Sequence, residues 1–476
     1  MLEAYQKFSI KAESAAEEIL DCIAKNSRFI INCHYDADGI TAAGIIAKSL
    51  HRQNVNFHLK LIKQIDQETV GTLSDSISDT IILGDIGSGY LHLLKNIGKS
   101  KKIFILDHHQ IDGDVNDEIT QVNPHLFGID GGKEISGAGV TYLVAKALDK
   151  KNIDLSPLAV VGAVADMQDK NEKRELDSLN SFIVKDAIEA GLLKAERDLI
   201  IYGRETRPIH KALSHTMNPF MPGLSGREDN CLALLSSLSI PIKDGDRWRT
   251  IVELSNDEKK KIFSAIVEHM TSKGVSGSAA MTLIGTVYTL INEDMWTSTR
   301  DAREYATLLN ACGRMDRPSL GVAICMGERG SAVKEVTDLL SEHRRTLASY
   351  ISLITEKPEN TERYENLAII HSEEFLNENM TGAISSLLSS SETFEKNKVI
   401  IVLAKTKNGD IKLSARGTDE LIEKGLNLGM IMQTIAKRYE GNGGGHKIAA
   451  GAQIPESNKE NFLIDLKNEI SRSLSK

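Results

Sequence analysis

The stretch Ile105-Leu106-Asp107-His108-His109-Gln110 decides the fold class and points to the chemistry. It ends an apolar run that begins at Ile103, so a predicted buried strand leads directly into an acid and two histidines. Parallel strands deliver functional groups at their carboxyl ends. Imidazole and carboxylate together suit a first-row divalent metal. Taken alone, the triplet also fits a pair of satisfied or surface histidines.

Three other segments repeat this arrangement of an apolar run, an acid or histidine, and a turn. The run Arg28 to Cys33 leads into His34-Tyr35-Asp36-Ala37-Asp38. The run Thr80 to Leu83 leads into Gly84-Asp85, and the run Ala159 to Ala165 leads into Asp166. A single strand-end Asp is usually a turn or cap residue. Four such ends in one α/β pattern instead predict a shared cleft at one edge of a sheet.

The first of these segments carries three functional side chains. His34, Asp36 and Asp38 alternate along the chain, so they face one side if the backbone stays extended. Gly39 then permits a sharp turn, and the following residues to Ser49 predict a helix packed close to the sheet.

These motifs, in this order, resemble the DHH phosphoesterase superfamily. They are more closely similar to its RecJ-like nucleases, of the archaeal type associated with the replication complex GINS. The motifs are His34 to Gly39, Gly84-Asp85, Asp107-His108-His109, Ala165-Asp166, and the distant Gly443-Gly444-Gly445-His446-Lys447-Ile448-Ala449-Ala450-Gly451. The last resembles the signature of the DHHA1 domain that accompanies the superfamily.

The resemblance implies a role for each residue. Asp85 bridges two metals, Asp36 and His34 hold the first, and Asp38, His108 and Asp166 hold the second. His109 faces the scissile phosphate, and Asp107 orients an imidazole. One departure concerns Asn32, because superfamily members with small-molecule substrates usually have a ligand histidine further upstream. In this chain His34 would take that place.

The chemistry of the residues agrees with this implication. Five carboxylates and two or three imidazoles in one cleft repel one another and are costly to desolvate. Two divalent cations about 3.5–4 Å apart would resolve the conflict and would make a phosphodiester hydrolysis site. A His/Asp ligand set without thiolate fits manganese, with magnesium as the alternative.

Composition sets outer limits. A chain of 476 residues predicts two or three domains. The five cysteines form no C-x-x-C pair, which argues against a zinc ribbon or a disulfide framework. The N-terminus lacks the apolar core of a signal peptide, and no stretch approaches the 18 apolar residues of a membrane span. We therefore expect a cytoplasmic protein without a membrane partner.

The net charge of −9 argues against a general nucleic-acid coat protein but not against a nuclease. Arg204, Arg207 and Arg227 are candidates for a local basic groove that attracts nucleic acid. The alternative is that these arginines form ordinary surface or interdomain ion pairs.

The pattern along the chain predicts an α/β protein with four parts. Residues 1–190 form a DHH catalytic domain with an N-terminal helix and a mainly parallel sheet, in which Ser136 caps the helix up to Leu148. Residues 191–265 form a helical connector. Residues 266–360 form an intermediate α/β block that could dock a partner. The resemblance implies that residues 361–476 form a DHHA1 substrate-binding domain, with the active site in the cleft between DHH and DHHA1.

Secondary structure in the last two parts follows from the apolar runs. In the intermediate block we predict strands at Ala280 to Ile291 and Leu320 to Met326, and helices at Ala302 to Cys312 and Ser331 to Ser352. In the last part we predict strands at Leu367 to His371, Val399 to Ala404 and Ile411 to Arg416, with a turn at Asn408-Gly409.

The glycine-rich motif predicts phosphate binding. Its glycines, Gly444 and Gly445 among them, let backbone amides approach a phosphate, and His446 adds a donor. Ser414 and Arg416 share one face of a predicted strand, so Arg416 is a candidate phosphate clamp. The alternative is a flexible glycine linker.

Three functions fit these residues. The first is a metal-dependent exonuclease that degrades single-stranded DNA, or RNA, by a two-metal mechanism in replication or repair. The second is a phosphodiesterase for short oligonucleotides or nucleotide-like compounds. The third is a non-catalytic replication scaffold associated with GINS, as in a eukaryotic helicase-activating relative of RecJ. The third predicts eroded metal ligands, whereas all of them are present here. The residues read out neither strand polarity nor a choice between DNA and RNA.

Overall fold

The computed structural model describes residues 2–114, 119–217, 219–390 and 397–474. The chain divides into two compact units, Met1–Leu340 and Ser341–Lys476, and each is described by itself. Within the described residues, no helix is long and apolar enough to cross a membrane.

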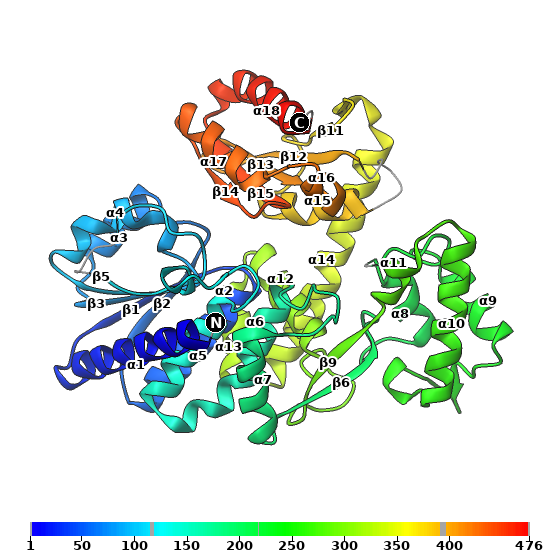
Figure 1. The fold of residues 1–476 in the computed structure, drawn as a ribbon, viewed down its shortest axis with the longest axis horizontal. Helices are drawn as coiled ribbons and strands as arrows, with labels where there is room; N and C mark the ends of the chain where they lie inside the picture. The colour runs from blue at the N-terminus through cyan, green and yellow to red at the C-terminus, as the bar shows by residue number, and fades with distance from the viewer. Residues whose placement is uncertain (1, 115–118, 218, 391–396, 475–476) are drawn as a thin grey trace. The chain divides into compact units, whose positions relative to one another are not determined.

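The first unit is built on a five-stranded parallel sheet with the strand order β2-β1-β3-β4-β5 (Figure 1). Its strands are β1 (Phe29–His34), β2 (Phe57–Ile62), β3 (Thr80–Gly84), β4 (Lys102–Leu106) and β5 (Ile119–Val122). The central strands are continuous apolar runs because both faces of the sheet are covered. This confirms the predicted parallel sheet.

Alternate residues of each central strand enter two different cores. Phe104 and Leu106 pack with residues of α1 (Leu2–Ala24), α2 (Ala37–Arg52) and α5 (Gly137–Leu148) on one face. Ile103 and Ile105 pack with residues of α3 (Gln67–Asp75) and α4 (Leu91–Gly98) on the other. This period of two follows from the strand pleat. Because all the strands pair in parallel, their carboxyl ends lie at one edge of the sheet.

Two predicted strands are helices instead. The run Ala159 to Ala165 lies in α6 (Ser156–Ala165), and the run Leu320 to Met326 lies in α13 (Pro318–Met326). Both helices are apolar around most of their circumference and largely buried, so their sequences lack the polar stripe that marks an amphipathic helix. A proline near the start of each helix, Pro157 and Pro318, suits the first turn.

The rest of the first unit is mainly helical. Its further helices are α7 (Ser178–Glu189), α8 (Ile209–His215), α9 (Glu228–Ser237), α10 (Asn256–Ser272), α11 (Gly277–Met281) and α12 (Ala302–Arg314). A small core of their own unites α8, α9 and α10. The strand predicted at Ala280 to Ile291 is β9 (Ile284–Leu290), which pairs antiparallel with β6 (Leu193–Leu199). A short hairpin joins β7 (Lys243–Asp244) and β8 (Arg247–Trp248), and α14 (Ser331–Glu356) runs on into the second unit.

The second unit contains a six-stranded mixed sheet with the order β10-β11-β12-β13-β15-β14. Its strands are β10 (Thr361–Arg363), β11 (Leu367–His371), β12 (Val399–Lys405), β13 (Ile411–Arg416), β14 (Asn442–Gly445) and β15 (Ala449–Ile454). The helices are α15 (Thr381–Ser390), α16 (Asp419–Glu423), α17 (Leu428–Arg438) and α18 (Lys459–Leu474), and α17 and α18 share a core with the sheet. The three strands predicted here are confirmed.

Candidate metal centre

Loops at the carboxyl edge of the parallel sheet bring together most of the acids and histidines singled out in the sequence. β1 ends at His34, and the chain continues into Asp36 and α2; β3 is followed by Asp85, and β4 by Asp107-His108-His109. Asp166 joins them from the C-terminal end of α6, not from a strand. The cluster therefore forms as predicted, with one ligand delivered by a different element.

Three groups of side chains place their ligand atoms within 4.8 Å of one another. They are His34 with Asp36 and Asp85, then Asp38 with His108 and Asp166, then Asp85 with His108 and His109. The first two are the ligand sets that the resemblance implied for the two metals. Asp85 adjoins both sets, because its Oδ2 lies 3.7 Å from His34 Nδ1 and its Oδ1 lies 3.2 Å from His108 Nε2.

Asp85 itself fits a cation ligand better than a structural acid. The residue is buried, with a positive φ of 56°, and its backbone amide donates to the Leu106 carbonyl. Within the described residues, neither of its carboxylate oxygens has a hydrogen-bond partner of acceptable geometry. A buried, unsatisfied carboxylate is costly unless a cation compensates it.

The ring of His108 is oriented for the same purpose. Its Nδ1 lies 2.7 Å from the Gly131 carbonyl oxygen, which can only accept, so Nδ1 carries the proton. Nε2 then faces carboxylate oxygens of Asp85 at 3.2 Å, Asp166 at 3.3 Å and Asp38 at 3.8 Å. A carbonyl that fixes the remote nitrogen is the usual support of a metal-binding histidine.

The sequence predicted that Asp36 and Asp38 would alternate along an extended chain, but they do not. Asp36 is the N-cap of α2 and accepts from the Gly39 amide at 3.0 Å, which places Asp38 inside the first helical turn. Gly39 is required there, because a Cβ atom would lie 2.2 Å from the His34 carbonyl oxygen. The capping preference of Asp in this position outweighs the extended conformation.

The carboxylate of Asp38 is held at the start of α5. It accepts from the amides of Gly137 at 2.6 Å and Ala138 at 3.1 Å. Ser136 caps this helix through the Gly139 amide, as predicted. The start of α5 therefore binds the side chain of Asp38. The carboxylate of Asp38 still lies within reach of His108 and Asp166.

Asp107 organises the loop after β4 and holds His109, whose Nδ1 also lies 3.7 Å from Asp85 Oδ1. It accepts from the Ser88 amide at 2.9 Å and from His109 Nδ1 at 2.8 Å. The side chain of His109 is 43% exposed, while that of Asp107 is fully buried. Asp107 thus orients the ring of His109, which is partly exposed to solvent.

Protonation of the cluster reflects the crowding of like charges. Burial and repulsion from Asp85 raise the pKa of Asp38 and, against the attraction of His108, raise the pKa of Asp166 to about 7. Burial alone would lower the pKa of His34 and His108, but the surrounding carboxylates raise both. A divalent cation would compete with protons for groups whose pKa is raised in this way.

Sequence reasoning missed a contribution from α12. Its segment Asn310 to Arg314 packs on the loop after β1, where Asn310 Oδ1 accepts from the Ala37 amide at 3.2 Å. A Cβ atom on Gly313 would lie 2.1 Å from the Tyr35 carbonyl oxygen, so only glycine permits this approach. Burial lowers the pKa of Arg314, and the charges of Tyr35 and Asp36 oppose it. The signal was present in the sequence as Asn310-Ala311-Cys312-Gly313-Arg314, but nothing there tied it to the cluster.

The arginines considered for a groove have other partners. Arg204 is buried and pairs with Asp198 at 2.6 Å, and Arg207 is buried with its guanidinium 5.0 Å from the Tyr202 ring centre. Arg227 is exposed and pairs with Asp229 at 2.9 Å. The ion-pair alternative describes Arg204 and Arg227, and buried side chains cannot line an open groove.

In the second unit the glycine motif is part of a sheet, so the linker alternative is wrong. Gly444 pairs with Gly451, and a Cβ atom on it would meet nothing within 4 Å, whereas one on Gly443 would lie 2.6 Å from the Met432 carbonyl oxygen. Gly445 has a φ of 134°, which favours glycine. Close packing and backbone conformation therefore explain Gly443 and Gly445, whereas space alone does not require glycine at position 444.

The remaining predicted phosphate contacts lie beside this motif. Ser414 and Arg416 share the less buried face of β13, as their alternation indicated, and Arg416 pairs in register with Ala449. Ser414 Oγ donates to Thr381 Oγ1 at 2.8 Å. His446 lies in the turn between β14 and β15, where its backbone amide donates to the Ala449 carbonyl.

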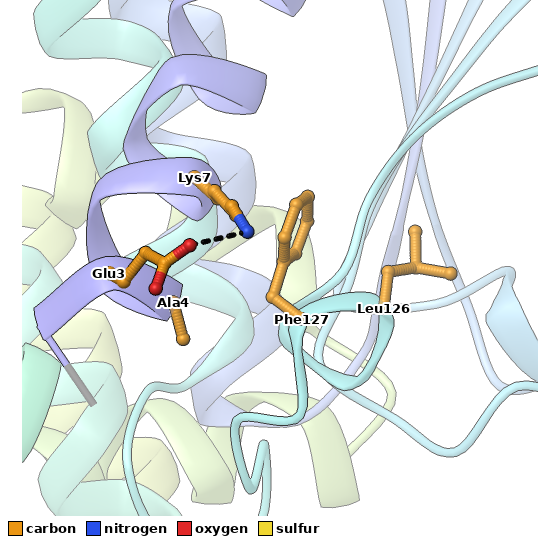
Figure 2. Close-up of a pocket in the computed structure, with 5 residues that line it drawn as sticks. All are labelled: Glu3, Ala4, Lys7, Leu126 and Phe127. Atoms are coloured by element: carbon orange, nitrogen blue, oxygen red, sulfur yellow. Dashed lines mark ion pairs between the residues drawn. The ribbon is translucent and has the colours of Figure 1, made fainter.

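A surface cavity of about 410 Å³ lies elsewhere in the first unit, between α1 and the turn after β5. Figure 2 shows its lining, which comprises Glu3, Ala4, Lys7, Leu126 and Phe127, with Glu3 paired to Lys7 at 2.8 Å. None of the acids or histidines of the metal centre lines it, and we assign it no role.

Three family models match the chain. Residues 28–165 match the N-terminal domain of the DHH family, residues 201–284 match the DHH-CID domain, and residues 368–472 match the DHHA1 domain. An uncharacterized protein of Methanocaldococcus jannaschii is 32% identical over 439 residues, which cover 90% of each chain. The single-stranded-DNA-specific exonuclease RecJ of Bacillus subtilis is 25% identical over 184 residues, covering 36% of this chain and 23% of that protein.

Solved structures share the fold at low sequence identity. RecJ from Thermus thermophilus, in complex with Mn²⁺, matches with a TM-score of 0.58 and 16% identity, covering 97% of this chain and 55% of that one. CDC45 from Entamoeba histolytica matches with a TM-score of 0.63 and 12% identity, covering 96% of this chain and 99% of that one. With its three matched domains and a relative that is similar over nine tenths of both chains, this chain belongs to the DHH family and has a RecJ-like fold that includes a DHHA1 domain.

Proposed function

We propose that the chain is a metal-dependent phosphodiesterase, a hydrolase that removes nucleotides from an end of single-stranded nucleic acid. One observation carries this proposal: acids and imidazoles converge at the carboxyl edge of the sheet in two sets, and buried Asp85 belongs to one set and adjoins the other. A stable fold gains nothing from such a concentration of unsatisfied charge, whereas a pair of cations would require it.

In this proposal His34, Asp36 and Asp85 hold one cation, and Asp38, Asp85, His108 and Asp166 hold the other. When bound, two divalent cations stabilise the charge that develops on a phosphoryl group during an in-line displacement. Manganese suits the mixed oxygen and imidazole ligands, and magnesium is the alternative. The RecJ of Thermus thermophilus was solved in complex with Mn²⁺ and with Mg²⁺, which supports either ion.

His109 and Arg314 are the proposed substrate contacts in the first unit. Asp107 accepts from His109 Nδ1 and so orients this partly exposed ring, which would face a phosphate oxygen of the substrate. Arg314 lies close enough to Asp36 and Tyr35 for their charges to oppose the lowering of its pKa by burial. Its guanidinium would bind the same phosphate through two parallel N–H donors.

The second unit would supply a further set of contacts along the nucleic-acid backbone. We propose that Ser414, Arg416 and His446 bind phosphate oxygens, with the Gly444 and Gly445 backbone close to the same group. The predicted parts 191–265 and 266–360 would connect the DHH and DHHA1 domains. An extended single strand suits such contacts, because phosphate contacts track a backbone without reading its bases.

Of the two other candidate functions, only the scaffold has specific support. A phosphodiesterase for short oligonucleotides would need the same metal centre but not the whole length of the chain. A non-catalytic replication scaffold is favoured by the likeness to CDC45, which extends over nearly the full length of both chains. The complete ligand set weighs against the scaffold, because a protein without chemistry has no reason to retain it.

Partner binding is a separate part of the proposal. The exposed side of α14 is the proposed docking surface for the GINS complex of the replication machinery, which would place the nuclease in replication or repair. Stiffening of the connection between the domains is the alternative role of the same helix.

One experiment separates these functions. End-labelled single-stranded DNA and RNA, carrying either a 5′ or a 3′ label, are incubated with the chain and Mn²⁺ and resolved on a gel. An exonuclease releases mononucleotides from one labelled end and leaves duplexes intact. Cleavage restricted to short oligonucleotides would favour the small-substrate enzyme, and no cleavage of any substrate with either metal would favour the scaffold.

A further inference from the structure

Gln168 is a neighbour of the metal centre, because it bonds to the same backbone carbonyl as His108, and it is not one of the clustered acids and histidines. It follows α6 two residues after Asp166, and its backbone amide donates to the Ala163 carbonyl at the end of that helix. Its side chain is buried, with 5% of the residue exposed. A buried amide in this position needs partners for both of its ends.

Those partners form a directed chain of hydrogen bonds that ends at His108. Asn180 Nδ2 donates to Gln168 Oε1 at 2.7 Å, and Gln168 Nε2 donates to the Gly131 carbonyl oxygen at 2.9 Å. The same oxygen accepts from His108 Nδ1 at 2.7 Å. A carbonyl has two lone pairs, so the two bonds fill its acceptor capacity.

Both ends of this chain are fixed. Asn180 lies on α7, where its backbone amide donates to the Glu134 carbonyl. Gly131 packs directly against the backbone of His108, because a Cβ atom on it would lie 2.0 Å from the His108 carbonyl oxygen. The carbonyl that sets the tautomer of His108 is therefore held in place by Gln168.

We infer that Gln168 is a positioning residue that fixes the orientation and tautomer of His108 for divalent-cation binding. The inference rests on the proposed function, since it assigns His108 as a ligand. Gln168 touches neither substrate nor cation in this account. Without its amide, the Gly131 carbonyl would lose one of two donors and its fixed position, and His108 Nε2 would no longer be directed at Asp85 and Asp166.

The alternative is a purely structural role, in which Gln168 only donates a hydrogen bond to the buried Gly131 carbonyl. Asn152 offers a matched control, because it is equally buried in the first unit and has the same pair of bonds. Its Nδ2 donates to the Ala145 carbonyl at 2.8 Å, and its Oδ1 accepts from Arg52 at 2.8 Å. It lies after the C-terminal end of α5, whereas the metal centre adjoins the start of that helix.

The test measures Mn²⁺ binding to the full chain by calorimetry, with bound Mn²⁺ also followed by electron paramagnetic resonance. Gln168→Met keeps the side-chain volume without hydrogen bonds, and we expect its Mn²⁺ affinity to fall by about ten- to hundred-fold, the usual effect of losing such a support. Gln168→Glu should lose at least as much, because a carboxylate would face the carbonyl oxygen. Asn152→Leu should lower the melting temperature and leave Mn²⁺ affinity unchanged.

Two results would overturn the inference while leaving the metal centre intact. One is wild-type Mn²⁺ affinity and resonance line shape in Gln168→Met, and the other is an equal loss of affinity in Asn152→Leu. A wild-type chain that binds no Mn²⁺ at a His108-dependent site would overturn the proposed function itself, and this inference with it.

Discussion

The Nε2 atom of His108 lies 3.2 Å from Oδ1 of Asp85, and both side chains are almost completely buried. Because Nδ1 of this ring is engaged by the Gly131 carbonyl, the facing atom carries a lone pair unless the ring is charged. A lone pair opposite a carboxylate is repulsive. The contact therefore requires a proton or a cation between the two residues, and this requirement links metal binding to pH.

The first prediction concerns this linkage. The pKa of Asp166 is raised to about 7, above its ordinary value of 3.8, by burial and by nearby carboxylates. A group with a raised folded-state pKa contributes stability at low pH and loses it as the pH rises through about 7. His34 and His108 are shifted in the same direction. The metal-free chain should lose stability between pH 4 and pH 8, and Mn²⁺ should restore it.

Melting temperatures with and without Mn²⁺ at pH 6 and pH 8 check this prediction. The stabilisation by Mn²⁺ should be larger at pH 8, where fewer protons compete for the ligands. Asp166→Asn should reduce this difference. A Mn²⁺ effect that is the same at both pH values, or larger at pH 6, would contradict the linkage.

The second prediction concerns Arg314. Arg314→Ala should lower kcat/KM by about ten- to hundred-fold, because a charge-assisted hydrogen bond to phosphate contributes about 1.5–3 kcal/mol. Arg314→Lys should recover part of this loss, since it keeps the charge without the fork. Arg317 is a nearby control that is exposed and paired with Glu335. Equal kinetics for Arg314→Ala and Arg317→Ala would remove Arg314 from the site.

The third prediction concerns the second unit. Arg416→Ala and His446→Ala should raise KM or shorten processive runs, because they remove phosphate contacts and no metal ligand. Product lengths on long single-stranded substrates give the measurement. Arg472, exposed on α18, is the control. If both changes leave cleavage untouched, the DHHA1 domain is not half of the active site.

The fourth prediction concerns the partner. Lys334 and Asp338 lie four residues apart on the exposed side of α14. Reversing both charges should abolish co-purification with a GINS subunit, and metal-dependent cleavage of short substrates should continue. A wild-type chain that binds no GINS subunit in calorimetry would leave a stand-alone nuclease.

The sequence alone was sufficient for the sheet and for most of the metal centre. Asp85 and His108 follow continuous apolar runs, and such runs, bounded by turns, identify the strands of a parallel sheet. Their shared edge follows from parallel pairing, so the meeting of these side chains could be predicted without coordinates.

Asp166 shows where this reasoning fails. The run before it is apolar throughout, and periodicity cannot distinguish a buried helix from a buried strand when no polar face is present. The residue was nevertheless assigned to the cluster, because it was expected to end a strand and because it matches a motif of the family; the end of α6 brings it to the same edge instead. The contacts of Asn310 and Gly313 could not be predicted, since they join segments more than 270 residues apart through backbone approach. Gln168 was missed because its role depends on side-chain hydrogen bonds to Gly131 and Asn180, which no sequence pattern indicates.

The most direct test of the metal centre is nuclease activity in Asp85→Asn. This change keeps the shape of the side chain and removes the charge that adjoins both ligand sets. We predict that Mn²⁺-dependent cleavage is abolished while the melting temperature without metal and the affinity for single-stranded DNA are retained, and that a chelator does the same to the wild type until Mn²⁺ is restored. Undiminished cleavage by Asp85→Asn would contradict the account.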